Sequence, residues 1–74
     1  ISDIKSLIQL KIQEYWHEYN RLMRYINSID DSLVRQIMTL RYINGMTWNA
    51  VADTIGGNTE DSIRMIHNRF LLNH

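Results

Sequence analysis

The sequence contains no cysteine and no proline, and only three of its 74 residues are glycine. Without cysteine there is no disulfide, no thiolate zinc site and no cysteine nucleophile, and the composition fits a reducing compartment. Without proline, helices can run uninterrupted, so the glycines supply most of the breaks. They lie at Gly45, Gly56 and Gly57. These absences predict a helical protein that is stabilised by packing alone.

The sequence also lacks an excess of positive or negative residues, and it has no long apolar segment. Eight Lys and Arg balance eight Asp and Glu, so no strongly basic field indicates nucleic acid. No apolar run approaches the roughly 20 residues that span a bilayer, and no segment has the pattern of a secretion signal. A chain of 74 residues buries enough surface for one small core only. We therefore expect a soluble, cytoplasmic protein with no membrane partner.

The patterns of catalytic and metal sites are absent as well. His17, His67 and His74 lack the spacing of metal ligands. No glycine-flanked serine accompanies a histidine and an aspartate in a triad order, and Gly56-Gly57 lacks the lysine of a phosphate-binding loop. We expect no enzyme activity, no catalytic residue, no metal and no cofactor.

The first stretch of the chain is strongly amphipathic. Apolar residues recur every seven positions, and others follow four positions later: Ile1, Ile8, Tyr15, Leu22 and Ile29, then Ile12, Tyr19 and Ile26. This spacing predicts one long helix over about Asp3 to Asn27, within a first unit of residues 1–28.

The apolar surface of this helix is broad. Leu7, Leu10, Trp16 and Met23 lie off the main stripe, and apolar surface of this kind usually marks association. We expect a homodimer through the N-terminal helix. The alternative is that the helix packs on its own domain and leaves Trp16 partly exposed. With Ile8 at heptad position a, Lys11 and Glu18 occupy would-be d positions, so a strict two-stranded coiled coil is not expected.

Residues 29–74 are expected to form a second unit of three helices. Ser28 to Ser32 offers capping oxygens for a helix that ends near Ile43, before Asn44-Gly45. Thr47 can cap a short helix, and Asn58 or Thr59 can cap the last one. The inward residues are Trp48, Val51, Ala52 and Ile55 in the third helix and Ile63, Ile66 and Phe70 in the fourth. Two short helices joined by a glycine turn form a helix-turn-helix, so the fold class is all-α.

One part of this second unit resembles a known family. Leu40-Arg41-Tyr42, Gly45, Val51-Ala52 and Ile63-Arg64-Met65-Ile66 are similar to region 4 of sigma-70 factors, over about Asp30 to Leu72. The long N-terminal helix and the turn Gly56-Gly57-Asn58-Thr59 look more like small phage or prophage regulators of the ArpU and RinA kind. The resemblance implies a sequence-specific DNA-binding transcriptional regulator, with double-stranded DNA and RNA polymerase as partners. The alternative is a protein-interaction module that binds RNA polymerase or another transcription protein without reading DNA, which the neutral charge favours.

The fourth helix supplies the candidate base contacts. Successive residues of an α-helix are rotated by about 100° around its axis. With Ile63, Ile66 and Phe70 facing inward, the residues that face outward are Asp61, Arg64, Met65 and Asn68. Arginine pairs well with guanine and asparagine with adenine. The resemblance implies that Arg64 reads a base and that Glu60 and Asp61 lie at contact positions. Since the family commonly has arginine where Glu60 stands, both carboxylates have a second interpretation, stabilisation of the helix dipole.

Three further polar residues, Thr47, Asn49 and Thr59, are candidate phosphate donors, although capping alone would explain both threonines. Arg41 and Arg69 either approach the DNA backbone or pair with Asp30, Asp31 or Asp53. Ala52 is either a point of close helix approach or simply a good helix former.

Overall fold

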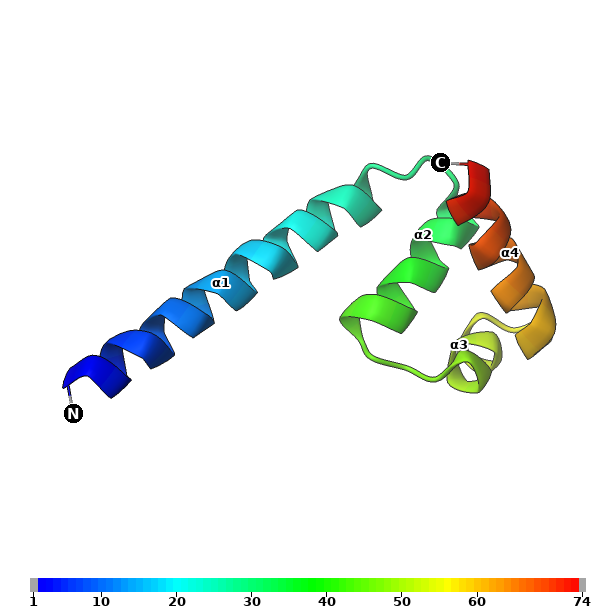
Figure 1. Ribbon diagram of the computed structural model, residues 1–74. Coiled ribbons are helices and arrows are strands. Elements are labelled where there is room, and N and C mark those ends of the chain that lie inside the picture. The colour runs from blue at the N-terminus through cyan, green and yellow to red at the C-terminus, as the bar shows by residue number, and fades with distance from the viewer. Residues whose placement is uncertain (1, 74) are drawn as a thin grey trace.

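The computed structural model describes residues 2–73, which form helices and no strand. The elements are α1 (Ser2–Asn27), α2 (Ser32–Met38), the π-helix η1 (Thr39–Ile43), α3 (Trp48–Ile55) and α4 (Glu60–Asn73). Figure 1 shows α1 projecting away from a group formed by the other helices, and the molecule measures 52 × 23 × 17 Å. The expected all-α fold, a long N-terminal helix followed by three shorter ones, is confirmed.

The helix α1 contacts the rest of the chain only near its C-terminal end. Ile26 is 1% exposed and packs with Ile29, Val34 and Met38, and Leu22 lies against the same group. By contrast, every residue from position 4 to position 21 is exposed. Most of this helix therefore carries its apolar side chains in solvent.

The second predicted helix ends at Ile43 as expected, but it consists of an α-helix followed by a π-helix. Asp31 caps α2, because its Oδ1 accepts from the backbone N–H of Leu33 at 2.9 Å and of Val34 at 3.3 Å. After Met38 the chain widens into η1, and the Asn44 N–H donates to the Thr39 carbonyl five residues back. The Thr39 hydroxyl also donates to the Arg35 carbonyl at 2.8 Å, a type of bond that bends helices.

The helices α3 and α4 begin at the predicted caps. The Thr47 hydroxyl accepts from the Ala50 N–H at 3.2 Å, and the Thr59 hydroxyl accepts from the Ser62 N–H at 3.1 Å. Thr59 rather than Asn58 is therefore the cap of α4. Between the helices Gly56 and Gly57 have φ of 75° and 72°, a left-handed conformation that residues with a Cβ rarely adopt.

The core consists of two clusters that meet at Ile66. Ile37, Val51, Ala52 and Ile63 form one, and Ile26, Ile29, Val34 and Met38 form the other. Ala52 is 4% exposed and Ile63 is fully buried, so a small side chain lies where α3 meets α4. This burial agrees with the interpretation of Ala52 as a point of close helix approach.

Two structural features are absent from the residues described. No helix within residues 2–73 is both long and apolar enough to cross a membrane. The same residues contain no group of three or more histidines and carboxylates arranged to hold a metal ion.

Candidate nucleic-acid interface

The α3–turn–α4 unit buries one side of α4 and exposes the other. The helix α3 ends at Gly56, whose N–H donates to the Ala52 carbonyl at 2.9 Å. On the inner side of α4, Ile63 and His67 are buried and Ile66 is partly buried. The other side of the helix has no covering element, so its side chains form the candidate interface.

The predicted outward residues are exposed. They are Asp61, Arg64, Met65 and Asn68. Met65 is 56% exposed. The structure therefore confirms the predicted phase of α4 and brings these four side chains onto one surface.

The predicted phosphate contacts lie at the two helix starts. Thr47, Asn49 and Thr59 are all exposed. Both threonine hydroxyls accept a capping hydrogen bond, and a hydroxyl that accepts still has its own proton to donate. Capping and phosphate contact are therefore compatible in these two residues.

Both candidate base readers already have protein partners. The Arg64 Nη2 donates to the Glu60 Oε1 at 2.9 Å, with 50% and 39% of the two side chains exposed. The Asn68 Oδ1 lies 3.0 Å from the Nδ1 of His67. Glu60 and Asp61 occupy the first turn of α4, where carboxylates stabilise the helix dipole. Glu60 thus has a structural role on this helix.

A buried histidine cluster was missed by the sequence reasoning, which considered His67 only as a metal ligand. His67 is 5% exposed, and its Nε2 lies 2.7 Å from the Tyr42 hydroxyl. The Trp48 ring meets it edge-on with centroids 4.8 Å apart. The cluster therefore joins η1, α3 and α4 behind the exposed face.

Arg41 does not form the predicted pair with an aspartate, and its approach to the DNA backbone stays a prediction. Its Nη1 donates to the Met46 carbonyl at 2.7 Å, and its guanidinium lies 4.8 Å from the centre of the Trp48 ring. Arg41 therefore stabilises the loop before α3 instead of pairing with an aspartate. Asp31, one of the suggested partners, caps α2. Arg69 is exposed.

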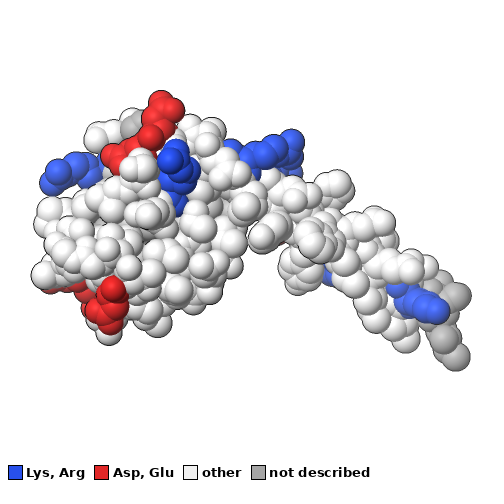
Figure 2. All heavy atoms as spheres, turned by 180° about the vertical axis from the view of Figure 1, so that it is seen from behind, with Lys and Arg blue, Asp and Glu red and all other residues white. Residues whose placement is uncertain are grey.

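The charge around the interface is sparse. Residues 29–74 contain four arginines and five carboxylates. On the face shown in Figure 2, blue and red side chains occur in small separate groups, and no continuous blue patch crosses the helical domain. The structure thus offers no strongly basic surface on that face.

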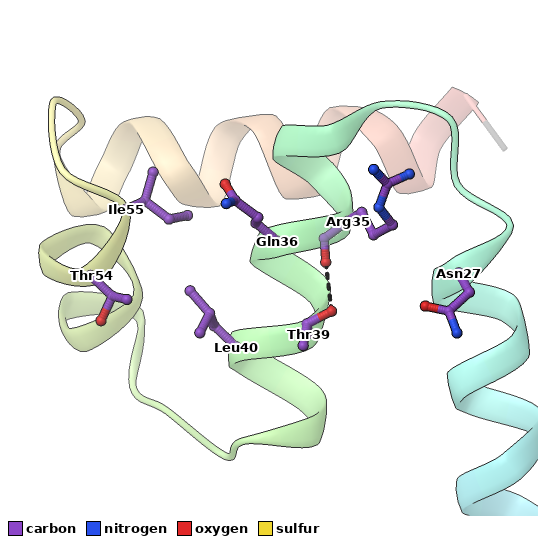
Figure 3. A pocket seen from close by; sticks show the side chains of 7 residues that line it. All are labelled: Asn27, Arg35, Gln36, Thr39, Leu40, Thr54 and Ile55. Carbon is purple, nitrogen blue, oxygen red and sulfur yellow. Dashed lines mark hydrogen bonds between the residues drawn. The ribbon is translucent and has the colours of Figure 1, made fainter.

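A shallow groove of about 400 Å³ runs along α2 between α3 and the end of α1. It is lined by Asn27, Arg35, Gln36, Thr39, Leu40, Thr54 and Ile55. In Figure 3, α4 passes behind α2, so the groove opens away from α4. Its cation, Arg35, donates from Nη1 to the Ile29 carbonyl at 2.7 Å. The groove is therefore separate from the candidate interface.

Comparisons with known proteins add no family to this description. No family model matches the chain, and neither a curated protein nor a solved structure matches it. The function is therefore argued from the residues and geometry above.

Proposed function

We propose that this protein is a sequence-specific DNA-binding transcription regulator that inserts α4 into the major groove. The observation that carries the proposal is the exposed face of α4, where Asp61, Arg64, Met65 and Asn68 project from a helix fixed by a buried inner side. A helix presented in this way by a helix-turn-helix unit matches the geometry with which such units read base edges.

The chemistry of this face suits base recognition. The Arg64 guanidinium can donate two hydrogen bonds to guanine, and the exposed Met65 side chain can contact a thymine methyl group. Asn68 can pair with adenine once its Oδ1 leaves His67. Because the Arg64–Glu60 pair is about half exposed, exchanging Glu60 for a guanine costs little free energy. Thr47, Asn49 and Thr59 would donate to phosphates on either side.

A second copy would strengthen this weakly charged interface. Few cations are present to neutralise phosphates, so one domain alone should bind weakly. We propose that the protein acts as a homodimer joined through α1. Two DNA-binding domains in one dimer bind more tightly than one, because binding of the first raises the effective concentration of the second, provided that both DNA half-sites can be reached.

A second function is favoured by one observation, the five carboxylates against four arginines in residues 29–74. A surface with slightly more negative than positive charge attracts the phosphates of DNA poorly, and it is better suited to binding another protein. In that case the same face of α4 would bind RNA polymerase or another transcription protein without reading DNA.

The test is selection from a pool of randomised duplex DNA, followed by gel-shift titration of the selected sequence with and without RNA polymerase. Arg64→Ala should weaken specific binding by about 1 to 3 kcal/mol. Arg69→Ala is the matched control, because it removes the same charge from the same helix but lies on the opposite flank of the outward face. Enrichment of no sequence, together with binding to polymerase, would replace the first function with the second. Equal losses in the two variants would show that charge alone, and not base reading, drives binding.

A further inference from the structure

The helix α1 carries a regular apolar seam. Ile8, Ile12, Tyr15, Tyr19, Leu22 and Ile26 follow one another at intervals of four, three, four, three and four residues. The mean interval, about 3.5 residues, is that of a coiled-coil seam. With Ile8 assigned to heptad position d rather than a, all six residues occupy a and d positions, and Lys11 and Glu18 move to the flanking g position.

The two ends of this seam have different environments. Leu22 and Ile26 pack into the helical domain of their own chain. Ile8, Ile12, Tyr15 and Tyr19 lie on the same side of the helix and are 55%, 49%, 68% and 43% exposed. Figure 1 shows this part of α1 standing clear of the other helices. The apolar side of α1 that packs on its own domain thus continues along the helix into an uncovered apolar surface.

We propose that α1 of a second copy covers this surface and that the two helices run antiparallel. Ile12 of each copy lies against Tyr15 of the other, and Ile8 lies against Tyr19. The two-fold axis then passes beside residues 13 and 14, and the two helical domains lie at opposite ends of the pair.

The position of the domain favours the antiparallel direction. In a parallel pair, Ile26 of one copy would meet Ile26 of the other at the seam. Ile26 is 1% exposed because its own domain already covers it. A parallel pair would also place two domains at the same end of the helices. The antiparallel pair needs contact only along the exposed residues 8–19 and keeps the two domains at opposite ends.

Charge complementarity favours the same direction and fixes the register. Residues at g face each other across an antiparallel coil, so Lys11 of each copy meets Glu18 of the other, and the pair forms twice. In a parallel coil, g residues face e residues, here Trp16 and Met23, and neither charge finds a partner. An antiparallel shift by one heptad would bring Glu18 against Glu18. Within its own helix Lys11 has only a 4.0 Å contact with Glu14, with both side chains about two-thirds exposed.

The available area is large enough for a second copy. Ile4 and Trp16 flank the four exposed seam residues and are 64% and 60% exposed. Since an aromatic side chain alone presents about 150 to 250 Å², these six residues offer on the order of 500 Å² per copy. The total, on the order of 1,000 Å², reaches the lower range of specific interfaces.

The direction can be tested by cysteine cross-linking without any DNA, so the result does not depend on the proposed function. The chain has no cysteine, and each substituted residue is therefore the sole thiol of its copy. Ile8→Cys and Tyr19→Cys should form a disulfide when the two variants are mixed and none when either is alone. In the antiparallel pair two copies of residue 8 lie roughly 16 Å apart along the axis, too far for a disulfide. Self-linking of either variant alone, or no link in the mixture, would overturn the proposal.

The register can be tested by reversing charges and measuring the dimer dissociation constant by sedimentation equilibrium. Lys11→Glu should raise that constant on the order of tenfold, because two attractive contacts become repulsive. Lys11→Glu combined with Glu18→Lys should restore it. Gln13→Glu, on the opposite side of the helix, is the control for added negative charge and should leave it unchanged. A double variant as weak as the single one, or a wild-type protein that is monomeric at tens of micromolar, would overturn the pairing.

Discussion

Arg64 and Glu60 are joined across one turn of α4, with the guanidinium Nη2 2.9 Å from the carboxylate Oε1. The pair links the candidate base reader to a carboxylate in the first turn of the same helix. A nucleic acid that binds Arg64 therefore competes with Glu60 for the guanidinium and also brings phosphates near a carboxylate. DNA affinity should respond to substitution of either partner, and in opposite directions.

Glu60→Gln should tighten specific DNA binding by about 0.5 to 1 kcal/mol, because it frees Arg64 and removes repulsion from phosphates. Titration of the selected duplex at fixed salt measures the change. Asp30→Asn, in the segment between α1 and α2, is the control for net charge. If both variants tightened binding equally, the Arg64–Glu60 pair would have no specific part in recognition.

Ile63→Ala should lower the free energy of unfolding by roughly 2 to 5 kcal/mol, because a fully buried side chain would leave a cavity between the helices. Urea unfolding followed by circular dichroism measures it. Met65→Ala, two positions along and 56% exposed, should change stability by less than about 0.5 kcal/mol. The reverse order would mean that the inner and outer sides of α4 are wrongly assigned.

Tyr42→Phe should destabilise the domain by about 1 kcal/mol, because His67 would lose the partner that lies 2.7 Å from its Nε2 while remaining buried. Thermal unfolding of the variant tests this. Tyr25→Phe removes a hydroxyl from an exposed tyrosine that is not a seam residue and should leave the melting temperature unchanged at equal protein concentration. A stable Tyr42→Phe variant would show that ring packing alone holds His67.

The salt dependence of DNA binding should be shallow. Each phosphate neutralised contributes a slope of about −0.9 to the logarithm of the association constant against the logarithm of salt. Arg64 and Arg69 are the cations of α4, so each copy should neutralise only a few phosphates. A steep slope, like that of a strongly basic repressor, would mean that another surface of the protein contacts the backbone.

Most of the fold could be predicted because apolar spacing and capping residues act locally. Thr47 and Thr59 mark the starts of α3 and α4, and the glycines mark the breaks between helices. The change from α-helix to π-helix at Thr39 could not be predicted. Thr39 donates to the Arg35 carbonyl, and Leu40 and Ile43 pack against different clusters, whereas the apolar pattern of η1 resembles that of an ordinary helix.

The sequence predicts which residues of the candidate site are exposed, but not the hydrogen bonds that they form. Phase alone places Arg64 and Asn68 outside, and both are exposed. The bonds that engage them depend on rotamers and on neighbours such as His67, which sequence spacing does not specify. His67 itself lies four residues after Ile63 and three before Phe70, so its position on the inner side was readable. DNA binding, polymerase binding and dimerisation stay predictions.

The uncovered stretch of α1 also affects how this helix folds. A helix that is exposed along residues 4–21 gains little from tertiary contacts, which supply most of the stability of helices in proteins. If pairing with a second copy supplies the missing contacts, helix formation and association become one equilibrium. The far-ultraviolet signal of the N-terminal arm would then rise with protein concentration, and its amide protons would exchange fast in dilute solution and slowly in concentrated solution.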